Sequence, residues 1–249
     1  GNTANLLASY VHDCGRHGVI LSGAGLAQKV HHNIIENCRT TAITVSSTTS
    51  ASGSVMGNTL YGAENKLGIC LSLATGVTNT SILNSILYGF VTGVDHADTQ
   101  SVGYDDYNDY FNNTADVSAA GEWQKGSNDQ AVDPTFTSMA QLTGTTATTS
   151  GSVLTQSGGD FSSVTDGVDI LYLVSGTGIT AGKYGITSHT ATTVTLDIAP
   201  GTNATADKVW QITTGHNFAI GTNLKALGSP GAFPAALSTG YLDIGAVQR

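Results

Sequence analysis

The residues best suited to chemistry stand in one short segment, Val30–Cys38, which reads VHHNIIENC. His31, His32 and Glu36 are of the types that bind metal ions or transfer protons. A metal site needs ligands that converge on one point, but neighbouring side chains of a strand point to opposite faces. The alternation around this segment places His31 inward and His32 outward. It therefore favours one core histidine and one surface histidine over a metal site.

A second candidate pairs a histidine with a glutamate. His12, in LLASYVHDC, and Glu36, in VHHNIIENC, hold equivalent places in two successive similar segments, so they are expected to lie side by side on an outer surface. With Arg39 nearby, such a pair could act as general acid and base on a sugar. Asp13, Arg16 and His17 add to this cluster. Solvated surface charge is the simpler interpretation.

Aspartates form the third candidate. The string DHADTQSVGYDDYND contains Asp95, Asp98, Asp105, Asp106 and Asp109. Carboxylates on neighbouring segments could chelate calcium or act as the paired acids of a glycoside hydrolase. The string lacks the central glycine and terminal glutamate of a calcium loop, so a structural or solvated role is favoured. The alternation places Asp106 inward, which indicates a change of register or the end of the repeat.

Tyrosines in and near this stretch could stack on a sugar ring, because aromatic faces suit the C–H groups of a pyranose. The candidates for glycan contact are Tyr104, Tyr107 and Tyr88. Packing in the core explains part of the aromatic run, which also includes Tyr110 and Phe111.

Composition limits the functions that these residues can serve. Only 11% of the residues are charged, against about 25% in an average globular protein. Abundant glycine, threonine, serine and asparagine suit an all-β, turn-rich chain. The net charge of −9 argues against nucleic acid as a partner, and no apolar run is long enough for insertion into a membrane. The chain begins within a repeat and without methionine, so a fragment or processed product is expected.

A repeat of about 25 residues must position these side chains. Its expected anchors are Ser9, Asn33, Asn58, Asn84 and Asn108. Apolar residues alternate around each anchor as in a strand, and a second strand follows in HGVILSG, TAITVSS, LGICLSL and GFVTGVD. Two or three strands per repeat are typical of a parallel β-solenoid, whose coils bury their apolar faces on one another. The four asparagines are expected to form a ladder of hydrogen-bonded amides.

The cysteines follow the same repeat. Cys14 and Cys38 hold equivalent places one coil apart, within reach of a disulfide if coils are about 4.8 Å apart. Burial as two small apolar side chains is favoured. Cys70 stands alone in its coil, and no cysteine–histidine pair suggests nucleophilic catalysis.

Residues 5–120 resemble the right-handed parallel β-helix family that includes pectate-lyase-like enzymes and phage tailspikes. The resemblance implies an all-β fold of about five coils. It implies little about activity, because this fold carries lyases, hydrolases, epimerases and inert scaffolds. A polyuronate lyase needs basic residues, which are scarce here. In residues 1–120 they are Arg16, Lys29, Arg39 and Lys66.

The C-terminal third resembles the cap that ends such proteins, split into DPTF at Asp133–Phe136 and a tail at Asn217–Arg249. Strand-like runs between the halves predict an inserted five-stranded β-barrel or sandwich. Its segment DGVDILYLVSGTGITAGKYGI resembles modules of phage and environmental viral structural proteins. The expected organisation is coils and the start of the cap over 1–136, a linker over 137–150, the inserted module over 151–215, and the rest of the cap over 216–249.

These observations favour a structural and adhesive function. The expected protein is an extracellular or virion-associated rod, like a tailspike or surface fibre, that self-associates and could contact glycans. The alternative is a polysaccharide-degrading hydrolase or lyase. Its candidate catalytic residues are Asp105, Asp106, Asp109, His12 and Glu36. No cofactor is expected, although calcium at the aspartates stays open.

Overall fold

The computed structural model describes residues 4–12, 14, 16–22, 27–36, 38–46, 52–62, 68–75, 77, 80–96, 103–118, 123–136, 141–213, 218, 220, 224 and 245. The regular elements of this described part are all β-strands. The chain divides into two compact units. One unit joins Gly1–Thr137 to Phe218–Arg249, and the other is Ser138–Asn217.

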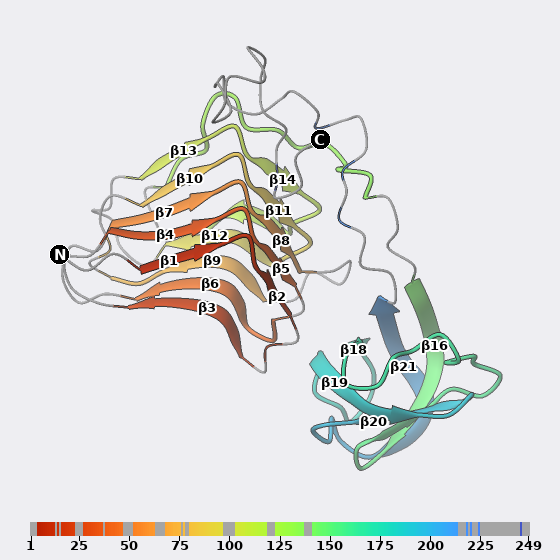
Figure 1. The fold of residues 1–249 in the computed structure, drawn as a ribbon. Coiled ribbons are helices and arrows are strands. Elements are labelled where there is room, and N and C mark those ends of the chain that lie inside the picture. Colours follow the sequence, from red (N-terminus) through yellow and green to blue (C-terminus); the bar gives the residue numbers. More distant parts are fainter. Residues whose placement is uncertain are drawn as a thin grey trace. The chain divides into compact units, whose positions relative to one another are not determined.

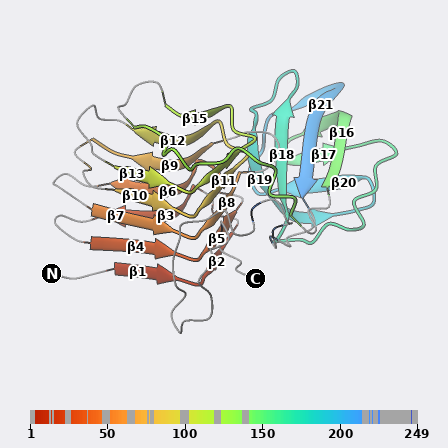
Figure 2. The same cartoon turned by 90° about the horizontal axis from the view of Figure 1, so that it is seen from above.

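The first unit contains a parallel β-solenoid whose coils each have three short strands (Figure 1). Sheet 1 contains β1 (Ala4–Leu7), β4 (Ala27–His31), β7 (Ser52–Met56), β10 (Ser81–Leu83) and β13 (Tyr104–Asp106). Sheet 2 contains β2 (Tyr10–Val11), β5 (Ile34–Glu36), β8 (Thr59–Tyr61), β11 (Ile86–Tyr88) and β14 (Asp109–Phe111). Sheet 3 contains β3 (His17–Ser22), β6 (Thr41–Ser46), β9 (Ile69–Leu73), β12 (Thr92–His96) and β15 (Ala115–Val117). The three stacked parallel sheets confirm the predicted parallel β-helix, which makes about four turns rather than the five coils expected (Figure 2).

The interior of the solenoid is a stack of branched apolar side chains. Val30, Val55 and Ile82 occupy it from sheet 1, and each is 0% exposed. Ile35 and Leu60 meet them from sheet 2. Full burial of one such side chain stabilises by about 1.5–3 kcal/mol. No coil can bury these residues alone, so stacking itself supplies the stability.

A left-handed residue marks the corner between sheets 1 and 2 in every coil. These corner residues are Ala8, His32, Gly57, Asn84 and Tyr107, with φ between 47° and 61°. The corner breaks the alternation, so the inward residue lies three positions, rather than two, before the residue that follows each corner. The predictions that His31 and Asp106 face inward are therefore wrong, because Val30 and Asp105 take those places.

A ladder joins the coils, but it differs from the predicted one in membership and bonding. Its rungs are Ser9, Asn33, Asn58, Ser85 and Asn108. Each of the first four donates its backbone N–H to the side-chain oxygen of the next, over 2.9–3.2 Å, and Asn33 and Asn58 also share an amide-to-amide bond. Asn84 was a predicted member, but the coil that leads to it is longer, and Asn84 takes the corner position instead.

The cap packs on the outer face of sheet 2. Phe136 and Phe218 lie 5.3 Å apart between ring centroids and both contact the ring of Tyr61. The backbone N–H of Gly245 donates to the carbonyl of Asn84. Segments on either side of the inserted unit thus meet on one sheet. Most of the predicted tail over 216–249 lies outside the described residues.

The second unit is a closed antiparallel barrel. Its strands, in order around the barrel, are β16 (Gln141–Ser150), β17 (Val153–Thr155), β20 (Thr193–Leu196), β19 (Gly182–His189), β18 (Ile170–Ser175) and β21 (Asn203–Thr213). Phe161, Leu171 and Trp210 belong to its core. The barrel has six strands rather than the five predicted. The predicted linker over 137–150 is wrong for residues 141–150, which form β16 and pair with β17 and β21.

Candidate functional site

The predicted aspartates lie where the solenoid ends. There, residues 123–132, called the end segment below, cross the last coil. The end segment has no strand of its own, but the backbone of Gln130 pairs in parallel with Asp109 of β14. The N–H of Gln130 donates to the carbonyl of Asn108 over 2.7 Å, and the N–H of Tyr110 donates to the carbonyl of Gln130 over 3.0 Å. The segment therefore caps the last coil and covers part of its open edge.

Asp105 faces the interior and is 6% exposed. Its Oδ2 accepts hydrogen bonds from the Tyr110 hydroxyl and from Trp123 Nε1, both over 2.6 Å. Its Oδ1 accepts one from Asn108 Nδ2 over 2.5 Å. Burial raises the pKa of the Asp105 carboxyl, and these donors oppose the shift. Asp105 therefore joins three polar side chains in the interior of the last coil.

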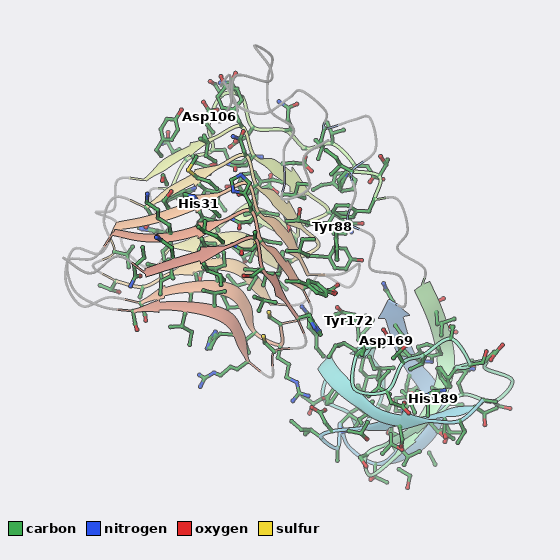
Figure 3. All side chains as sticks on the ribbon, viewed as in Figure 1. His31, Tyr88, Asp106, Asp169, Tyr172 and His189 are labelled. Carbon is green, nitrogen blue, oxygen red and sulfur yellow. The ribbon has the colours of Figure 1, made fainter. Side chains whose placement is uncertain are left out.

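Asp106 lies on the outer side of sheet 1 (Figure 3). Its two oxygens accept hydrogen bonds from the backbone and side-chain nitrogens of Asn128, over 2.9 and 3.0 Å. The N–H of Tyr107 and the hydroxyl of Tyr104 also donate to it. Asp106 thus binds the end segment to the outer edge of the last coil.

Asp109 lies on the outer face of sheet 2, in register with Ile86, and is 0% exposed. Its Oδ1 accepts a hydrogen bond from the N–H of Val132 over 2.9 Å. Its Oδ2 is buried and has no hydrogen-bond partner among the described residues. Burial, more than the neighbouring charge of Asp133, raises the pKa of Asp109 to about 7. A buried acceptor without a partner is costly in its charged form.

Asp129 is a member of this cluster that the sequence analysis missed. Its Oδ1 accepts the backbone N–H of Asn108 over 2.8 Å, so it serves as the rung after Asn108. Its Oδ2 accepts the N–H of Gly126. Burial, followed by the charge of Asp105, raises the pKa of Asp129 to about 7. Its spacing of 21 residues from Asn108 is the signal that could have revealed it.

The three predicted acids therefore do not face a common point. Asp105 points into the solenoid, Asp106 to the outer side of sheet 1 and Asp109 to the outer side of sheet 2. A glycoside hydrolase needs two carboxyl groups directed at one bond. Each acid instead accepts a donor of the end segment, namely Trp123, Asn128 or Val132.

Glu36 lies in one outer column of sheet 2 with Tyr61 and Tyr88, and His12, its predicted neighbour, follows directly after the end of β2. His12 and Glu36 differ in exposure. His12 is exposed and its ring stacks on Tyr10, with centroids 4.6 Å apart. Glu36 is only 1% exposed, and the Tyr10 hydroxyl donates to its Oε1. Asp13, from the same predicted cluster, lies outside the described residues.

The three predicted sugar-stacking tyrosines also separate. Tyr88 is 7% exposed, and its ring lies between those of Tyr61 and Phe111, with Phe136 beside it (Figure 3). Tyr104 is 57% exposed, and Tyr107 is half-buried at the corner that follows. Both remain open to a sugar on the outer side of sheet 1, whereas Tyr88 belongs to the packing beneath the cap.

His31, whose side chain points outward, contacts Ser54, which its position in the sequence did not predict. Its Nε2 lies 3.0 Å from the hydroxyl oxygen of Ser54, on the next strand of sheet 1 (Figure 3). Burial, then the charges of His32 and Lys29, lower the pKa of His31. A neutral imidazole beside a hydroxyl is a base next to a weak nucleophile. Among the described residues no carboxylate orients this ring, so the pair lacks the third member of a catalytic triad.

None of the three cysteines, Cys14, Cys38 and Cys70, is part of a disulfide. Cys38 and Cys70 are buried among the apolar side chains of the solenoid, and Cys14 packs against the same core while partly exposed. They act as small apolar residues, which the sequence analysis favoured over a disulfide.

On the barrel, the residues with chemical potential are a surface pair and a stacked pair. His189 Nδ1 lies 2.8 Å from Asp166 Oδ1, with both side chains partly exposed. Such surface pairs contribute about 0–1 kcal/mol. Lys183 Nζ lies 5.4 Å from the ring centroid of Tyr172, its cross-strand neighbour. Neither arrangement resembles a catalytic group.

No group of three or more His, Cys, Asp or Glu side chains in the described ranges is placed to hold a metal ion. Those ranges also include no helix that is long and apolar enough to cross a membrane. Comparison of the chain with models of protein families, with curated proteins and with solved structures gave no match.

Proposed function

We propose that this protein is a structural and adhesive β-helix, part of an extracellular or virion-associated fibre or spike. The observation that carries the proposal is the use made of the acidic cluster. Asp105, Asp106 and Asp109, together with Asp129, accept hydrogen bonds that hold the last coil and the end segment together. Because these carboxyl groups stabilise the end of the solenoid, they support a structural role for the protein.

Rigidity along the coil axis supports the same proposal. Three sheets and a continuous ladder of five rungs join every coil to the next. Neighbouring coils are held by backbone pairing, by ladder bonds and by buried apolar side chains at once. A body of this kind transmits force between its ends and holds an inserted unit such as the barrel.

The adhesive part of the proposal rests on the outer side of sheet 1. Lys29, Ser54, Ser81 and Tyr104 stand in register on successive strands, and each is exposed or half-buried. Together with Tyr107 at the neighbouring corner, they offer hydrogen-bonding groups and aromatic faces along the coil axis. This combination suits an extended glycan.

Self-association is proposed for the outer faces of the first described coil. Three large apolar side chains there, Leu7, Tyr10 and Ile20, are 48–55% exposed. Exposed apolar side chains favour contact with another chain.

A glycan array probed with the intact protein, followed by a reducing-end assay on the sugars that bind, tests this function. We expect binding without release of reducing ends. Tyr104→Ala should weaken binding, and the matched control Tyr104→Phe, which keeps the ring, should retain most of it. Polysaccharide hydrolysis is the competing function. Release of reducing ends that is abolished by Asp106→Asn would contradict the structural proposal.

A further inference from the structure

The end segment is held to the solenoid mainly through carboxyl groups. Two backbone hydrogen bonds involving Gln130 join it to the last coil. Trp123 also packs in the apolar core of the solenoid. The other hydrogen bonds between the described residues of the end segment and the solenoid run through side chains of aspartate. Trp123 donates to Asp105, Asn128 to Asp106 and Val132 to Asp109. Asp129 of the segment accepts the N–H of Asn108 in return. The attachment of this segment therefore depends on how these acids are charged.

Few positive charges balance the acids. Lys125 is the lysine of the end segment, and its Nζ lies 2.8 Å from Asp116 and 4.7 Å from the ring centroid of Tyr110. It favours the charged form of Asp109, whereas Asp116 and Asp133 disfavour it. Asp109 thus faces two acids and one lysine, and one of its own oxygens is buried without a partner in the described ranges.

Inside the last coil, too, few positive charges lie near the acidic groups. Asp105 faces the Tyr110 hydroxyl, Trp123, Asn108 and Asp129, and burial raises the pKa of the Tyr110 hydroxyl well above its usual range. The ring of His96 is 0% exposed and lies 6.1 Å from Trp123 between centroids. In the described part of the chain neither of its nitrogens has a hydrogen-bond partner. The carboxyls of Asp105 and Asp129 interact, and two interacting carboxyls are more stable when they share a proton.

We propose that the end segment and the last coil form a proton-dependent clasp, which is most firmly closed near pH 4 and loosens as the pH rises to about 7. The buried carboxyls of Asp109 and Asp129 hold protons in the closed state and lose them when the segment lifts into water. Opening exposes the edge of β14, where Gln130 is paired. A free strand edge is a template for pairing with another chain. The clasp thus links proton concentration to the availability of this end of the rod.

The direction in which the stability of the closed state changes with pH follows from proton linkage. Asp109 and Asp129 have pKa values of about 7 in the closed state, against an ordinary value of 3.8 in the open one. The closed state therefore binds more protons between these two values, and its advantage falls as the pH rises through that window. Above about pH 7 both states are deprotonated at these positions, so the loss is complete.

Amide hydrogen exchange, corrected for the intrinsic effect of pH, tests the clasp in the intact protein. The amides of Asn128 and Val132 should lose protection by at least about tenfold between pH 5 and pH 7, since one titrating group gives up to tenfold per pH unit. The amide of Ile86, which donates to Asn58 within the solenoid, is the internal reference and should keep its protection.

Variants identify the groups responsible. Asp109→Asn retains the acceptor for Val132, and Asp129→Asn restores the amide found at other rungs. Together they should remove most of the pH dependence. Asp95→Asn, which removes a half-buried carboxylate of β12 outside the clasp, is the matched control and should leave it intact. Protection that does not change with pH, or a double variant that keeps the full dependence, would overturn the proposal.

A second measurement covers the case in which the double variant does not fold. Carboxyl carbon chemical shifts of the wild-type aspartates, followed by NMR from pH 3 to pH 9, report each titration directly. Midpoints near neutrality for Asp109 and Asp129 support the clasp. Midpoints near the ordinary aspartate value for both of these groups would overturn it.

Discussion

In the solenoid, the buried amide of Asn58 bonds to the coils on both sides of it, whereas in the barrel the buried ammonium of Lys208 bonds within its own strand. Asn58 Oδ1 accepts from Asn33, its Nδ2 donates to the carbonyl of Val30, and its N–H donates to Ser85. Those partners stand 25–28 residues away.

Lys208 is equally buried, at 0% exposure. Its Nζ donates to Asn203, to the carbonyl of Thr205 and to Asp207, all within five residues on β21. These partners are partly or fully exposed to solvent. The two buried polar side chains therefore have different roles. Asn58 joins parts of the solenoid that are distant in the sequence, whereas the hydrogen bonds of Lys208 only compensate its own buried charge.

The largest expected effect is from Asn58→Leu. This change removes the acceptor of the Asn33 N–H and the Nδ2 donor to the carbonyl of Val30, whereas Asn33 Nδ2 keeps the carbonyl of Leu6. Each unsatisfied group costs about 1–3 kcal/mol, so we expect a loss of roughly 4 kcal/mol in the free energy of unfolding of the solenoid. Urea denaturation measures it. A loss below about 1 kcal/mol would show that the ladder is not a source of stability.

The next effect concerns pH, to which the two units should respond in opposite directions. Burial raises the pKa of Asp109 to about 7, so the solenoid should lose stability as the pH rises from about 4 to about 7, by up to about 4 kcal/mol from this group. Hydrogen bonds from Lys208 and Thr177 lower the pKa of Asp207 to about 2. The stability that Asp207 gives the barrel should be present above about pH 4 and lost as the pH falls through about 2.

The two tryptophans allow this comparison in one sample, because Trp123 lies in the solenoid unit and Trp210 in the barrel. Fluorotryptophan labelling should give one fluorine signal per unit during urea titrations at several pH values. Midpoints that move together in the same direction would contradict the predicted difference.

Gly57→Ala should have a smaller effect. Gly57 has a φ of 61°, and an added Cβ would stand 2.9 Å from the ring of His32. We expect a cost of about 2 kcal/mol from the left-handed backbone and the contact together. Gly158→Ala in the barrel is the matched control, with a φ of 70° and open space around it. It should cost about 1 kcal/mol. Equal thermal shifts would show that the corner contact is unimportant.

The smallest effect is expected from Lys208→Met. Removing the ammonium group leaves partners that water can reach, and methionine fills much of the same space. The free energy of unfolding of the barrel should change by less than about 1 kcal/mol. A loss of several kcal/mol in denaturant titrations would mean that this buried charge organises the barrel in the way that Asn58 organises the solenoid.

The periodicity of the sequence was sufficient to predict the solenoid, because coils that bury the same face must repeat the same pattern. It misplaced the rung between Asn58 and Asn108. The choice between Asn84 and Ser85 depends on coil length and on which residue adopts the left-handed corner, and asparagine suits both places. The inward position of Asp105 was missed for the same reason.

Other errors came from contacts between segments that are distant in the sequence. Tyr88 looks like a surface aromatic until Phe136 packs against it beneath the cap. Asp129 lies in a stretch without strand character and is recognisable only as a continuation of the ladder. The strand β16 was read as a linker because its threonines and glycine resemble a flexible segment. Threonine is nevertheless a good strand former when both edges find partners.

The ladder also has a direction, which bears on how the chain folds. Every rung donates its N–H to the rung that follows it in the sequence. During synthesis, the newest coil therefore holds a donor that stays unsatisfied until the next coil is made. Each coil thus presents an N–H group to which the next coil can bind. The series can end only at a residue that accepts without passing on the same bond, and Asp129 is that residue.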